Sequence, residues 1–497
     1  MREIKHKDVT VVGLARSGIG AANLLAGLGA RVTVTDTKTE EELKDVMPGL
    51  DTSVRLALGS HPEDIFMHAD MLIVSPGVPL TIRPLLLAKS KGIPIVGELE
   101  LAYEIAMYGS YNPPVLPLLE GGKGGFLAVT GTNGKSTTTA LLDFMMKKSG
   151  FKTILGGNIG NAVTEEIRKT LTAKHKGLRD NTSDTSHFTP DALSIAFIVV
   201  EVSSFQLESI KDFRPKVAAI VNITPDHLDR YHSLEEYNAA KARIFENQTN
   251  GDFLVLNRDD PETMKVINEK LRTKIEKPEI FYFSRKQEVE GLYSKGGIVY
   301  CNIPGLPRVP HKAPLITTEE IKIKGVHNLE NAMAASAMAL LAGCPIEAVI
   351  DSLKEFPGLE HRLEFVRELD GVSYFNDSKG TNVDAVIKSL ESFSRPVILI
   401  AGGRDKAGDF YRLRDLVREN VKALVLIGEA SEKIREALGD STDTEMAKDL
   451  KDAVNISRNR AAGGDVVLLS PACASFDMFA NFEDRGKQFK RIVTEMN

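Results

Sequence analysis

The chain has 497 residues, of which 42% are hydrophobic and 26% charged, and its formal net charge is −6. This length is typical of about three globular domains, and the acidic balance argues against a nucleic-acid partner, which would require a basic face. The three cysteines are scattered without metal-site spacing, and no apolar stretch is long enough to span a bilayer. We therefore expect a cytoplasmic protein without membrane insertion.

The N-terminal part of the chain carries the pattern of an α/β domain. Residues 8–12 form an apolar run, residues 19–28 a helical pattern and residues 30–35 a second apolar run. Together these segments predict a βαβ unit and a parallel sheet. Residues 71–74 and 93–96 predict two further strands.

The turn between the first strand and the first helix is a candidate ligand site. It contains Gly13 and Gly18, and Asp36 ends the second strand. Such a turn suits a diphosphate at the helix N-terminus. The two glycines do not complete the spacing of a dinucleotide-binding motif, so an NAD site and a UDP site both stay open.

The rest of the chain divides into two further α/β blocks. Residues 111–125 are rich in proline and glycine and are predicted to be a linker. Residues 172–190 are polar and cannot bury much apolar surface, so we expect a surface loop or disorder there. The last block has three predicted buried strands, at residues 396–401, 423–427 and 466–469. The sequence thus predicts three α/β domains, at residues 1–99, 100–357 and 358–497.

The strongest local motif is Thr-Gly-Thr-Asn-Gly-Lys-Ser-Thr, residues 130–137, between the predicted strand 126–130 and a predicted helix. Glycines and small residues let backbone N–H groups face a phosphate, and the helix N-terminus adds partial positive charge. Lys135 would reach the outer phosphates, and the Ser136 hydroxyl suits Mg²⁺. The loop is one residue shorter than the usual P-loop, which has four residues between its first glycine and the Gly-Lys pair.

This octapeptide resembles the ATP loop of the Mur ligases and of the related folylpolyglutamate synthetases, which activate a carboxylate as an acyl phosphate for attack by an amine. The resemblance implies a Rossmann-like UDP-binding domain, a central P-loop ATPase-like domain and a C-terminal Rossmann-like domain. It also implies ATP and Mg²⁺ as cofactors. The nucleotide would bind to the residues of the loop: Gly131, Thr132, Asn133, Gly134, Lys135, Ser136 and Thr137.

Two strand ends after the loop carry candidate metal ligands. Glu201 lies near the end of the apolar run 195–202, and His227 lies in Thr-Pro-Asp-His-Leu-Asp-Arg after the run 218–223. By itself a strand-end glutamate forms a salt bridge as often as it binds a metal, and Mg²⁺ prefers oxygen to histidine nitrogen. The Asp-His run is similar to that of the Mur ligases, which implies that Glu201, His227 and Ser136 bind Mg²⁺.

A lysine on the next predicted helix is a further candidate. The helix is predicted from Ser233, which has capping-box spacing to Glu236. Lys241 follows in Ala-Lys-Ala-Arg, and from the sequence alone it would be a solvated lysine. The resemblance implies a lysine carbamylated by CO₂, because the family's lysine in this run carries that modification. The anionic carbamate would then help to hold Mg²⁺, which an ammonium group cannot do.

Three later segments resemble nucleotide contacts of the family. Asn328 and Asn331 belong to a segment that precedes an Ala/Met-rich helix, with Asn328 as a possible N-cap, and the resemblance implies contacts with adenine. Arg362 resembles the arginine that reaches the nucleotide phosphates, a role that suits its fixed charge and forked donors. Asp377 is implied to contact the nucleotide as well. The residues implied to act in catalysis are Lys135, Glu201, His227, Lys241 and Arg362.

The last block resembles the D-glutamate-adding branch of the family. Asn-Asp-Ser-Lys-Gly-Thr-Asn, residues 376–382, matches its motif except that Gly380 replaces an alanine. The resemblance implies that Lys379 and Thr381 face phosphate or the D-glutamate carboxylate. Lys406 matches a lysine that binds D-glutamate, whereas Arg404 departs from the acidic residue of some members and is given no role.

The C-terminal run supports the same branch. Residues 470–486 resemble a segment specific to it, in which Ser475 and Phe482 match residues that hold the D-glutamate side-chain carboxylate. The string Asp-Asn-Pro-Arg, usual in the branch that adds lysine or meso-diaminopimelate, does not occur in the sequence. We therefore expect D-glutamate as the amine.

The first domain is implied to hold the UDP part of the other substrate. The resemblance assigns this role to Leu14, Arg16, Asp36 and Gly77, and it places Asn158 near the muramoyl peptide. The alternative for Asn158 is an ordinary turn asparagine.

The resemblance therefore implies an ATP-dependent ligase that joins D-glutamate to UDP-N-acetylmuramoyl-L-alanine through an acyl phosphate, in cell-wall precursor synthesis, and we expect it to be a monomer. Two alternatives stay open. One is a folylpolyglutamate-type ligase, against which the nucleotide site of the first domain argues. The other is an NAD-dependent dehydrogenase or regulator with a vestigial phosphate loop.

Overall fold

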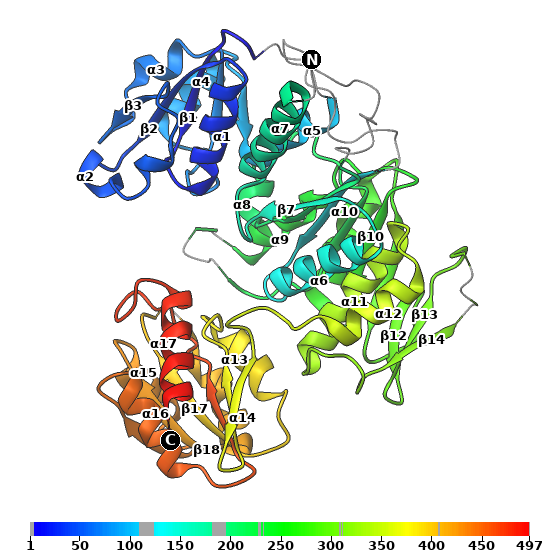
Figure 1. The fold of residues 1–497 in the computed structure, drawn as a ribbon, viewed down its shortest axis with the longest axis vertical. Helices are drawn as coiled ribbons and strands as arrows, with labels where there is room; N and C mark the ends of the chain where they lie inside the picture. Colours follow the sequence, from blue (N-terminus) through cyan, green and yellow to red (C-terminus); the bar gives the residue numbers. More distant parts are fainter. Residues whose placement is uncertain are drawn as a thin grey trace. The chain divides into compact units, whose positions relative to one another are not determined.

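The computed structural model describes residues 4–108, 124–180, 195–226, 230–231, 233–307, 310, 312–405 and 408–496. Within these residues the chain forms three β-sheets of five, nine and six strands, with helices on their faces (Figure 1). Most central strands are short runs of valine, isoleucine, leucine and alanine buried along their whole length. This pattern is expected of parallel strands that helices cover on both faces.

The first sheet is entirely parallel, in the order β3-β2-β1-β4-β5. The strand order reverses between β1 and β4, and in open α/β sheets ligands bind at such a point. Its strands are β1 (Asp8–Val12), β2 (Arg31–Asp36), β3 (Arg55–Leu58), β4 (Met71–Val74) and β5 (Ile95–Gly97). Its helices are α1 (Arg16–Gly27), α2 (Glu40–Leu43), α3 (Glu63–Met67) and α4 (Arg83–Ser90), and α5 (Glu98–Tyr108) follows β5 directly.

The second sheet has the order β14-β13-β12-β11-β10-β9-β6-β8-β7. Strand β6 lies between β8 and β9 and is parallel to both, so the carboxyl ends of these three strands meet at one edge. The strands are β6 (Gly125–Thr130), β7 (Thr153–Gly157), β8 (Phe197–Glu201), β9 (Val217–Ile220), β10 (Phe253–Asn257), β11 (Glu279–Ser284), β12 (Gly291–Lys295), β13 (Ile298–Asn302) and β14 (Ala313–Thr317). The helices are α6 (Lys135–Lys148), α7 (Val163–Asp180), α8 (Ser204–Leu207), α9 (Leu234–Ala242), α10 (Pro261–Thr273), α11 (Val326–Leu341) and α12 (Ile346–Glu355).

The third sheet has the order β15-β16-β20-β17-β18-β19 and is parallel except for β15. Its strands are β15 (Glu364–Leu369), β16 (Val372–Asn376), β17 (Val397–Gly402), β18 (Val421–Ile427), β19 (Asp443–Met446) and β20 (Val466–Leu469). Its helices are α13 (Val383–Leu390), α14 (Arg414–Asn420), α15 (Ser431–Leu438), α16 (Leu450–Arg460) and α17 (Phe482–Glu495).

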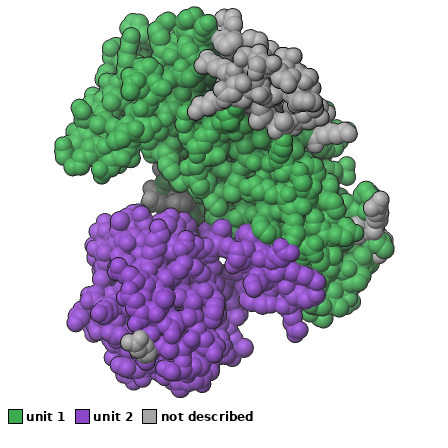
Figure 2. Space-filling view, in the orientation of Figure 1, with its two compact units in different colours: residues 1–317, 332–352 green, residues 318–331, 353–497 purple. Residues whose placement is uncertain are grey.

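The chain divides into two compact units, shown in Figure 2. Unit 1 comprises Met1–Thr317 and Ala332–Ser352 and holds the first two sheets, whereas unit 2 comprises Thr318–Asn331 and Leu353–Asn497 and holds the third. Within unit 1, α1 packs on α7 so closely that a Cβ added to Gly20 would lie 2.8 Å from Thr164 Oγ1. The first two sheets are therefore joined by helix packing within one unit.

The predicted elements agree well with the observed ones. The strands predicted at residues 8–12, 71–74 and 466–469 have the same bounds in the structure, and the other predicted strands differ by one to three residues at an end. Ser233 caps α9 as predicted, because its hydroxyl accepts the Glu236 N–H at 3.3 Å. Among the helices that the structure describes, none combines the length and apolarity needed to cross a bilayer.

Two local predictions are wrong. Residues 172–180, expected in a polar loop, continue α7, which begins with a buried stripe at Val163, Ile167 and Leu171 and so docks before its polar end. Asn328 is not an N-cap, because α11 begins at Val326. Residues 111–123 of the predicted linker and 181–190 of the predicted polar insertion lie outside the described residues.

Candidate active site

The glycine-rich loop lies where β6 ends and α6 begins, between the ends of β8 and β9. Gly131 has a φ of 151°, and a Cβ there would lie 2.5 Å from Val221 Cγ2, so only glycine fits. Asn222, which follows β9, holds the loop: its Oδ1 accepts the Asn133 N–H at 2.8 Å, and its Nδ2 donates to the Asn133 carbonyl at 3.0 Å. The protein itself therefore fixes the backbone of the loop. No role for Asn222 was predicted, because nothing in its sequence neighbourhood distinguishes it from a turn residue.

Two lysines predicted from distant motifs meet at this loop. The Gly131 carbonyl accepts hydrogen bonds from Lys135 Nζ at 2.9 Å and from Lys241 Nζ at 2.8 Å. Lys241 is 2% exposed, and burial, together with the neighbouring Lys135, holds the pKa of its amine well below the usual value. The negative charges of Asp226 and Glu201 act in the opposite direction. The alternative of a solvated lysine, which the sequence favours without the family resemblance, is thus excluded, because this face of the helix is buried.

Thr132 links the loop to the chain after β9 and to helix α9, which carries Lys241. Its hydroxyl donates to the Thr224 carbonyl at 3.0 Å and lies 3.1 Å from the Tyr237 hydroxyl. The Tyr237 ring in turn lies under the Lys241 amine, with 4.4 Å between Nζ and the ring centroid. The loop, the chain after β9 and helix α9 therefore form one connected scaffold.

Glu201 ends β8 and is paired with Val129 of β6, so its side chain lies beside the loop. It is 2% exposed, and its Oε1 accepts a hydrogen bond from Asn158 Nδ2 at 2.7 Å. Its Oε2 is buried without a hydrogen-bond partner. A buried carboxylate oxygen without a partner is unfavourable unless a cation or donor reaches it. The environment of Glu201 therefore fits a metal ligand.

The residues predicted for the UDP substrate lie at the reversal point of the first sheet. Leu14 donates its backbone N–H to Asp36 Oδ2 at 2.7 Å, which joins the ends of β1 and β2. Arg16 begins α1 and donates to the Gly160 carbonyl at 2.5 Å, in the loop that also carries Asn158. The structure therefore brings Leu14 and Asp36 together and places Arg16 against the loop that carries Asn158.

The remaining residue predicted for the UDP substrate, Gly77, contacts a residue that follows a strand of the second sheet. Its carbonyl accepts a hydrogen bond from Arg230 at 3.3 Å. Arg230 also pairs with Glu208 at 2.9 Å, and its guanidinium lies 4.2 Å from the centroid of the Phe205 ring. An arginine at the end of the Asp-His run therefore links the two sheets of unit 1.

In unit 2, Arg362 lies in a strained turn near Asp377. The residues on either side of it, His361 and Leu363, have positive φ angles of 66° and 45°, which are uncommon for residues other than glycine. Asp377 follows β16 and is 6% exposed. Burial raises the pKa of its carboxyl to about 6, although two serine hydroxyls, a backbone N–H and the Arg362 charge all favour the ionised form.

The two predicted adenine contacts also lie close together in unit 2. Asn331 Nδ2 donates to Asn328 Oδ1 at 3.3 Å, and Asn328 Nδ2 donates to the Lys324 carbonyl at 2.8 Å. Both asparagines are buried on the first turns of α11.

The residues predicted for D-glutamate lie at the carboxyl ends of β16 and β20 and at the start of α17. The Lys379 amine lies 3.6 Å from the centroid of the Phe482 ring. Thr381 donates its N–H to the Lys379 carbonyl at 2.8 Å, and Ser475 is 2% exposed. His227 and Lys406 lie outside the described residues.

The sequence analysis missed the role of Arg485 in this region. Its guanidinium is 1% exposed and donates to the hydroxyl and the carbonyl of Ser378, at 2.9 and 2.8 Å. It also reaches the carbonyls of Cys473 and Ala474, at 3.3 and 3.4 Å. Burial lowers the pKa of Arg485 to about 10. One cation therefore ties together three segments that carry the predicted D-glutamate residues, and only its place in the branch-specific run could have indicated this.

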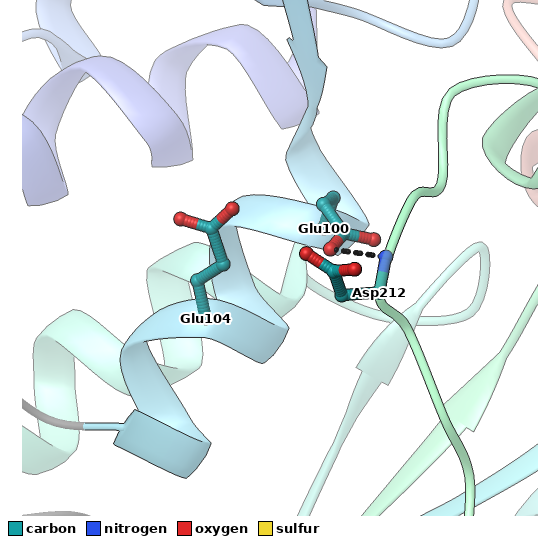
Figure 3. Close-up of side chains that lie close together, drawn as sticks. All are labelled: Glu100, Glu104 and Asp212. Atoms are coloured by element: carbon teal, nitrogen blue, oxygen red, sulfur yellow. Dashed lines mark hydrogen bonds between the residues drawn. The ribbon is translucent and has the colours of Figure 1, made fainter. Parts of the chain in front are cut away.

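Three acidic residues, Glu100, Glu104 and Asp212, lie close together elsewhere in unit 1 (Figure 3). The Glu100 carboxylate is already engaged, because both its oxygens accept backbone N–H groups of Lys211, Asp212 and Phe213 at 2.8–3.0 Å. Glu100 of α5 thus anchors the chain after α8, which explains its burial without a metal.

The chain was compared with known proteins. It is 46% identical over 495 residues to the UDP-N-acetylmuramoylalanine--D-glutamate ligase of Geotalea daltonii, covering 99% of this chain and 98% of that protein. It is 41% identical to the enzyme of the same name from Clostridioides difficile, covering 99% of this chain and 100% of that protein. Three family models match it: the Mur ligase MurD-like N-terminal domain at residues 7–97, the Mur ligase middle domain at 129–339 and the Mur ligase glutamate ligase domain at 361–473. The chain belongs to the Mur ligase family.

Solved structures share the fold. A pseudomurein peptide ligase type C from Methanothermus fervidus matches with a TM-score of 0.57 and 18% identity, over 99% of this chain and 100% of that one. The UDP-N-acetylmuramate-alanine ligase of Thermotoga maritima matches with a TM-score of 0.57 and 17% identity, over the same shares. The three-domain α/β architecture predicted from the sequence is therefore confirmed.

Proposed function

We propose that the chain is the ATP-dependent ligase that forms the amide bond between UDP-N-acetylmuramoyl-L-alanine and D-glutamate in the synthesis of peptidoglycan precursors. One observation carries this assignment: relatives 45–46% identical over essentially the whole chain are named UDP-N-acetylmuramoylalanine--D-glutamate ligase. The match of a MurD-like N-terminal domain to residues 7–97 argues against both the folylpolyglutamate-type ligase and the NAD-dependent protein.

The nucleotide would bind at the glycine-rich loop, with Lys135 at the outer phosphates. The support for this role is the fixed loop backbone and the position of the Lys135 amine at its Gly131 carbonyl. The further residues proposed to contact the nucleotide are Thr132, Asn133, Gly134, Ser136, Thr137, Asn328, Asn331, Arg362 and Asp377.

An Mg²⁺ ion would be held by Glu201, Ser136, His227 and the carbamate of Lys241. The unpartnered buried Oε2 of Glu201 supports this donor set, since Mg²⁺ prefers oxygen ligands. When bound, the ion supplies positive charge that offsets the negative charge of the phosphate oxygens.

The environment of Lys241 suits carbamylation. Only a neutral amine adds CO₂, and burial favours the neutral amine here. The addition forms a bond between Nζ and the carbon of CO₂ and releases one proton, which leaves an anionic carboxylate and one N–H. That N–H still has the Gly131 carbonyl as its acceptor, at the 2.8 Å distance of the unmodified amine. The modification also places a negative charge beside the Lys135 amine, which donates to the same carbonyl.

The two substrates would bind at the remaining predicted residues. The UDP-sugar would be held by Leu14, Arg16, Asp36 and Gly77, with Asn158 near the muramoyl peptide. D-Glutamate would be held by Lys379, Thr381, Lys406, Ser475 and Phe482. The contacts of Arg16 with the Asn158 loop and of Lys379 with Phe482 support these groupings.

In the proposed reaction, the L-alanyl carboxylate takes the terminal phosphoryl group of ATP. The amine of D-glutamate then attacks the acyl phosphate, a C–N bond forms, and phosphate leaves with the C–O bond electrons. Lys135 and Arg362 stabilise negative charge on the transferred group. We further propose that the protein acts as a monomer in the cytoplasm, since residues for all the substrates lie on one chain and ATP and UDP-sugars are cytoplasmic metabolites.

The test is phosphate release from ATP in the presence of UDP-N-acetylmuramoyl-L-alanine and Mg²⁺, with D-glutamate compared with L-glutamate, L-lysine, meso-diaminopimelate and no amine. We expect release that depends on D-glutamate, with the amide product observed by mass spectrometry. Release with a different amine would retain the ligase chemistry and refute the D-glutamate assignment. Release with no combination would refute the proposal.

A further inference from the structure

Asp377 is held by two serines from different elements. Its Oδ2 accepts hydrogen bonds from the Ser389 hydroxyl of α13 and from the Ser470 hydroxyl that follows β20, both at 2.7 Å. Its Oδ1 accepts the Leu363 N–H at 3.2 Å, next to Arg362. Both serines are buried, at 3% and 0% exposed. We call Ser389 and Ser470 the serine pair.

A glycine leaves room for this arrangement. A Cβ added to Gly380 would lie 2.6 Å from Asp377 Oδ2 and 2.8 Å from Ser470 Oγ. Gly380 is also held in place, because its N–H donates to the Asp377 carbonyl at 2.8 Å and its carbonyl accepts the Ala472 N–H at 2.9 Å. A side chain at position 380 would therefore push apart the carboxylate and one of its two hydroxyl donors.

We propose that Ser389 and Ser470 are positioning residues that keep Asp377 ionised and in one orientation for its contact with the nucleotide. The inference rests on the proposed function, in which Asp377 contacts ATP. A carboxylate accepts about four hydrogen bonds, and the two serine hydroxyls and the Leu363 N–H leave one acceptor position on Oδ1. A hydrogen-bond donor of the nucleotide, such as a ribose hydroxyl, could occupy this acceptor position.

The two serine hydroxyls are needed to keep Asp377 ionised, because the charges around it only partly offset the effect of burial. Arg362 and Arg485 favour the carboxylate, from the turn before β15 and from α17. Burial opposes them and raises the pKa to about 6. Four other charged groups on the neighbouring elements have partners of their own: Asp384 pairs with Arg412, Lys388 with Glu391 and Glu364 with Lys490, and the Lys379 amine lies over the ring of Phe482. The His361 ring also has a partner, because its Nδ1 accepts a hydrogen bond from Asn376 Nδ2 at 2.9 Å.

Removing one of the two hydroxyl donors should therefore raise the pKa of Asp377 towards the neutral pH at which the enzyme is assayed. We expect Ser470→Ala and Ser389→Ala each to raise the acid limb of the pH profile of kcat/KM for ATP by about one pH unit, because each removes one hydrogen bond to the ionised form. At pH 6.5, midway between the two pKa values, the KM for ATP should rise about threefold, and well below pH 6 it should rise about tenfold. The KM for UDP-N-acetylmuramoyl-L-alanine should not change.

Three further variants separate this role from a structural one. Ser389→Thr keeps the hydroxyl and should retain the wild-type pH profile. Gly380→Ala should reproduce the profile of Ser470→Ala, since it displaces the same hydrogen bond. Ser373→Ala, on β16 but without a contact to Asp377, is the matched control and should behave as wild type. Circular dichroism and gel filtration establish that each variant is folded.

The outcomes distinguish the inference from the function on which it rests. A wild-type protein that does not turn over ATP refutes the proposed function. If the wild type is active and the serine variants keep its pH profile and its KM for ATP, the inference is overturned and the proposed function stands. If an alanine variant does not fold, Ser389→Thr and Ser470→Cys decide instead: the threonine variant must keep the wild-type profile, and the weaker thiol donor must shift it.

Discussion

The burial of Asp377 predicts that this residue destabilises the folded protein at neutral pH. Its pKa is about 6 in the fold, against the usual 3.8. The difference corresponds to about 3 kcal/mol, since a tenfold change in protonation is about 1.4 kcal/mol. Below pH 3.8 the carboxyl is protonated in both states and burial carries no penalty. The unfolding free energy therefore falls as the pH rises through this range, and the full penalty is present above about pH 6.

Replacing Asp377 by asparagine removes the titration. The amide fits the same space, and the hydroxyls of the serine pair rotate to accept from its N–H₂ group. We expect the stability difference between the variant and wild type to shift in favour of the variant by about 1.4 kcal/mol between pH 5 and 7.5, which is roughly half of the full effect. Nucleotide affinity should fall in the same variant, because a neutral amide cannot replace the carboxylate.

The measurement has to report on unit 2 alone. The chain has no tryptophan, so we would follow amide hydrogen exchange of strands β16, β17 and β20 at several pH values. Asp415→Asn is the matched control, because the Asp415 side chain is 90% exposed. A difference between Asp377→Asn and wild type that is the same at pH 5 and 7.5 would refute the account of a carboxylate held ionised against desolvation.

Three further predictions concern the other groups of the site. Lys241→Met should abolish ligase activity, and the wild type in CO₂-free buffer should lose activity and the mass of one CO₂ together; a fully active protein whose native mass shows a bare amine contradicts the carbamate. Arg485→Lys keeps the positive charge but loses the forked donors that join three segments. We expect the KM for D-glutamate to rise about tenfold or more, because a hydrogen bond to a charged group contributes about 1.5–3 kcal/mol. The KM for ATP should not change. An unchanged KM for D-glutamate would mean that Arg485 does not shape this region. Glu201→Gln should abolish Mn²⁺ binding measured by electron paramagnetic resonance, and retained stoichiometric binding would exclude Glu201 as a ligand.

Much of the fold follows from local patterns in the sequence. Short apolar runs located central strands in each of the three sheets, because parallel strands are buried on both faces. The strands β10 (Phe253–Asn257) and β11 (Glu279–Ser284) of the second sheet were not predicted. The pattern did not predict edge strands such as β3 (Arg55–Leu58) and β19 (Asp443–Met446), which are largely exposed and therefore carry no continuous apolar signal. Residues 172–180 were assigned to a polar loop although they continue α7, since the apolar stripe that docks this helix occupies only its first half.

The sequence alone determined the motifs and their chemistry. The glycine-rich loop and the strand-end Glu201 were identified as candidate sites from residue type and spacing, whereas the polar runs after β16 and β20 were identified by their resemblance to the family. Local sequence carries this information because backbone geometry and donor chemistry depend on a few neighbouring residues. Family resemblance, and not spacing, supplied the roles of Lys241 and the D-glutamate residues.

Only the tertiary structure decided which of these residues act on one another. Lys135 and Lys241 meet at a single carbonyl, Glu201 is left with an unpartnered oxygen, and Asp377 is held by serines 12 and 93 residues away. These interactions depend on strand order and on the burial that follows from it. A pKa shift is set by the solvent that packing removes and by charges that the fold brings near, and neither quantity is contained in the local sequence.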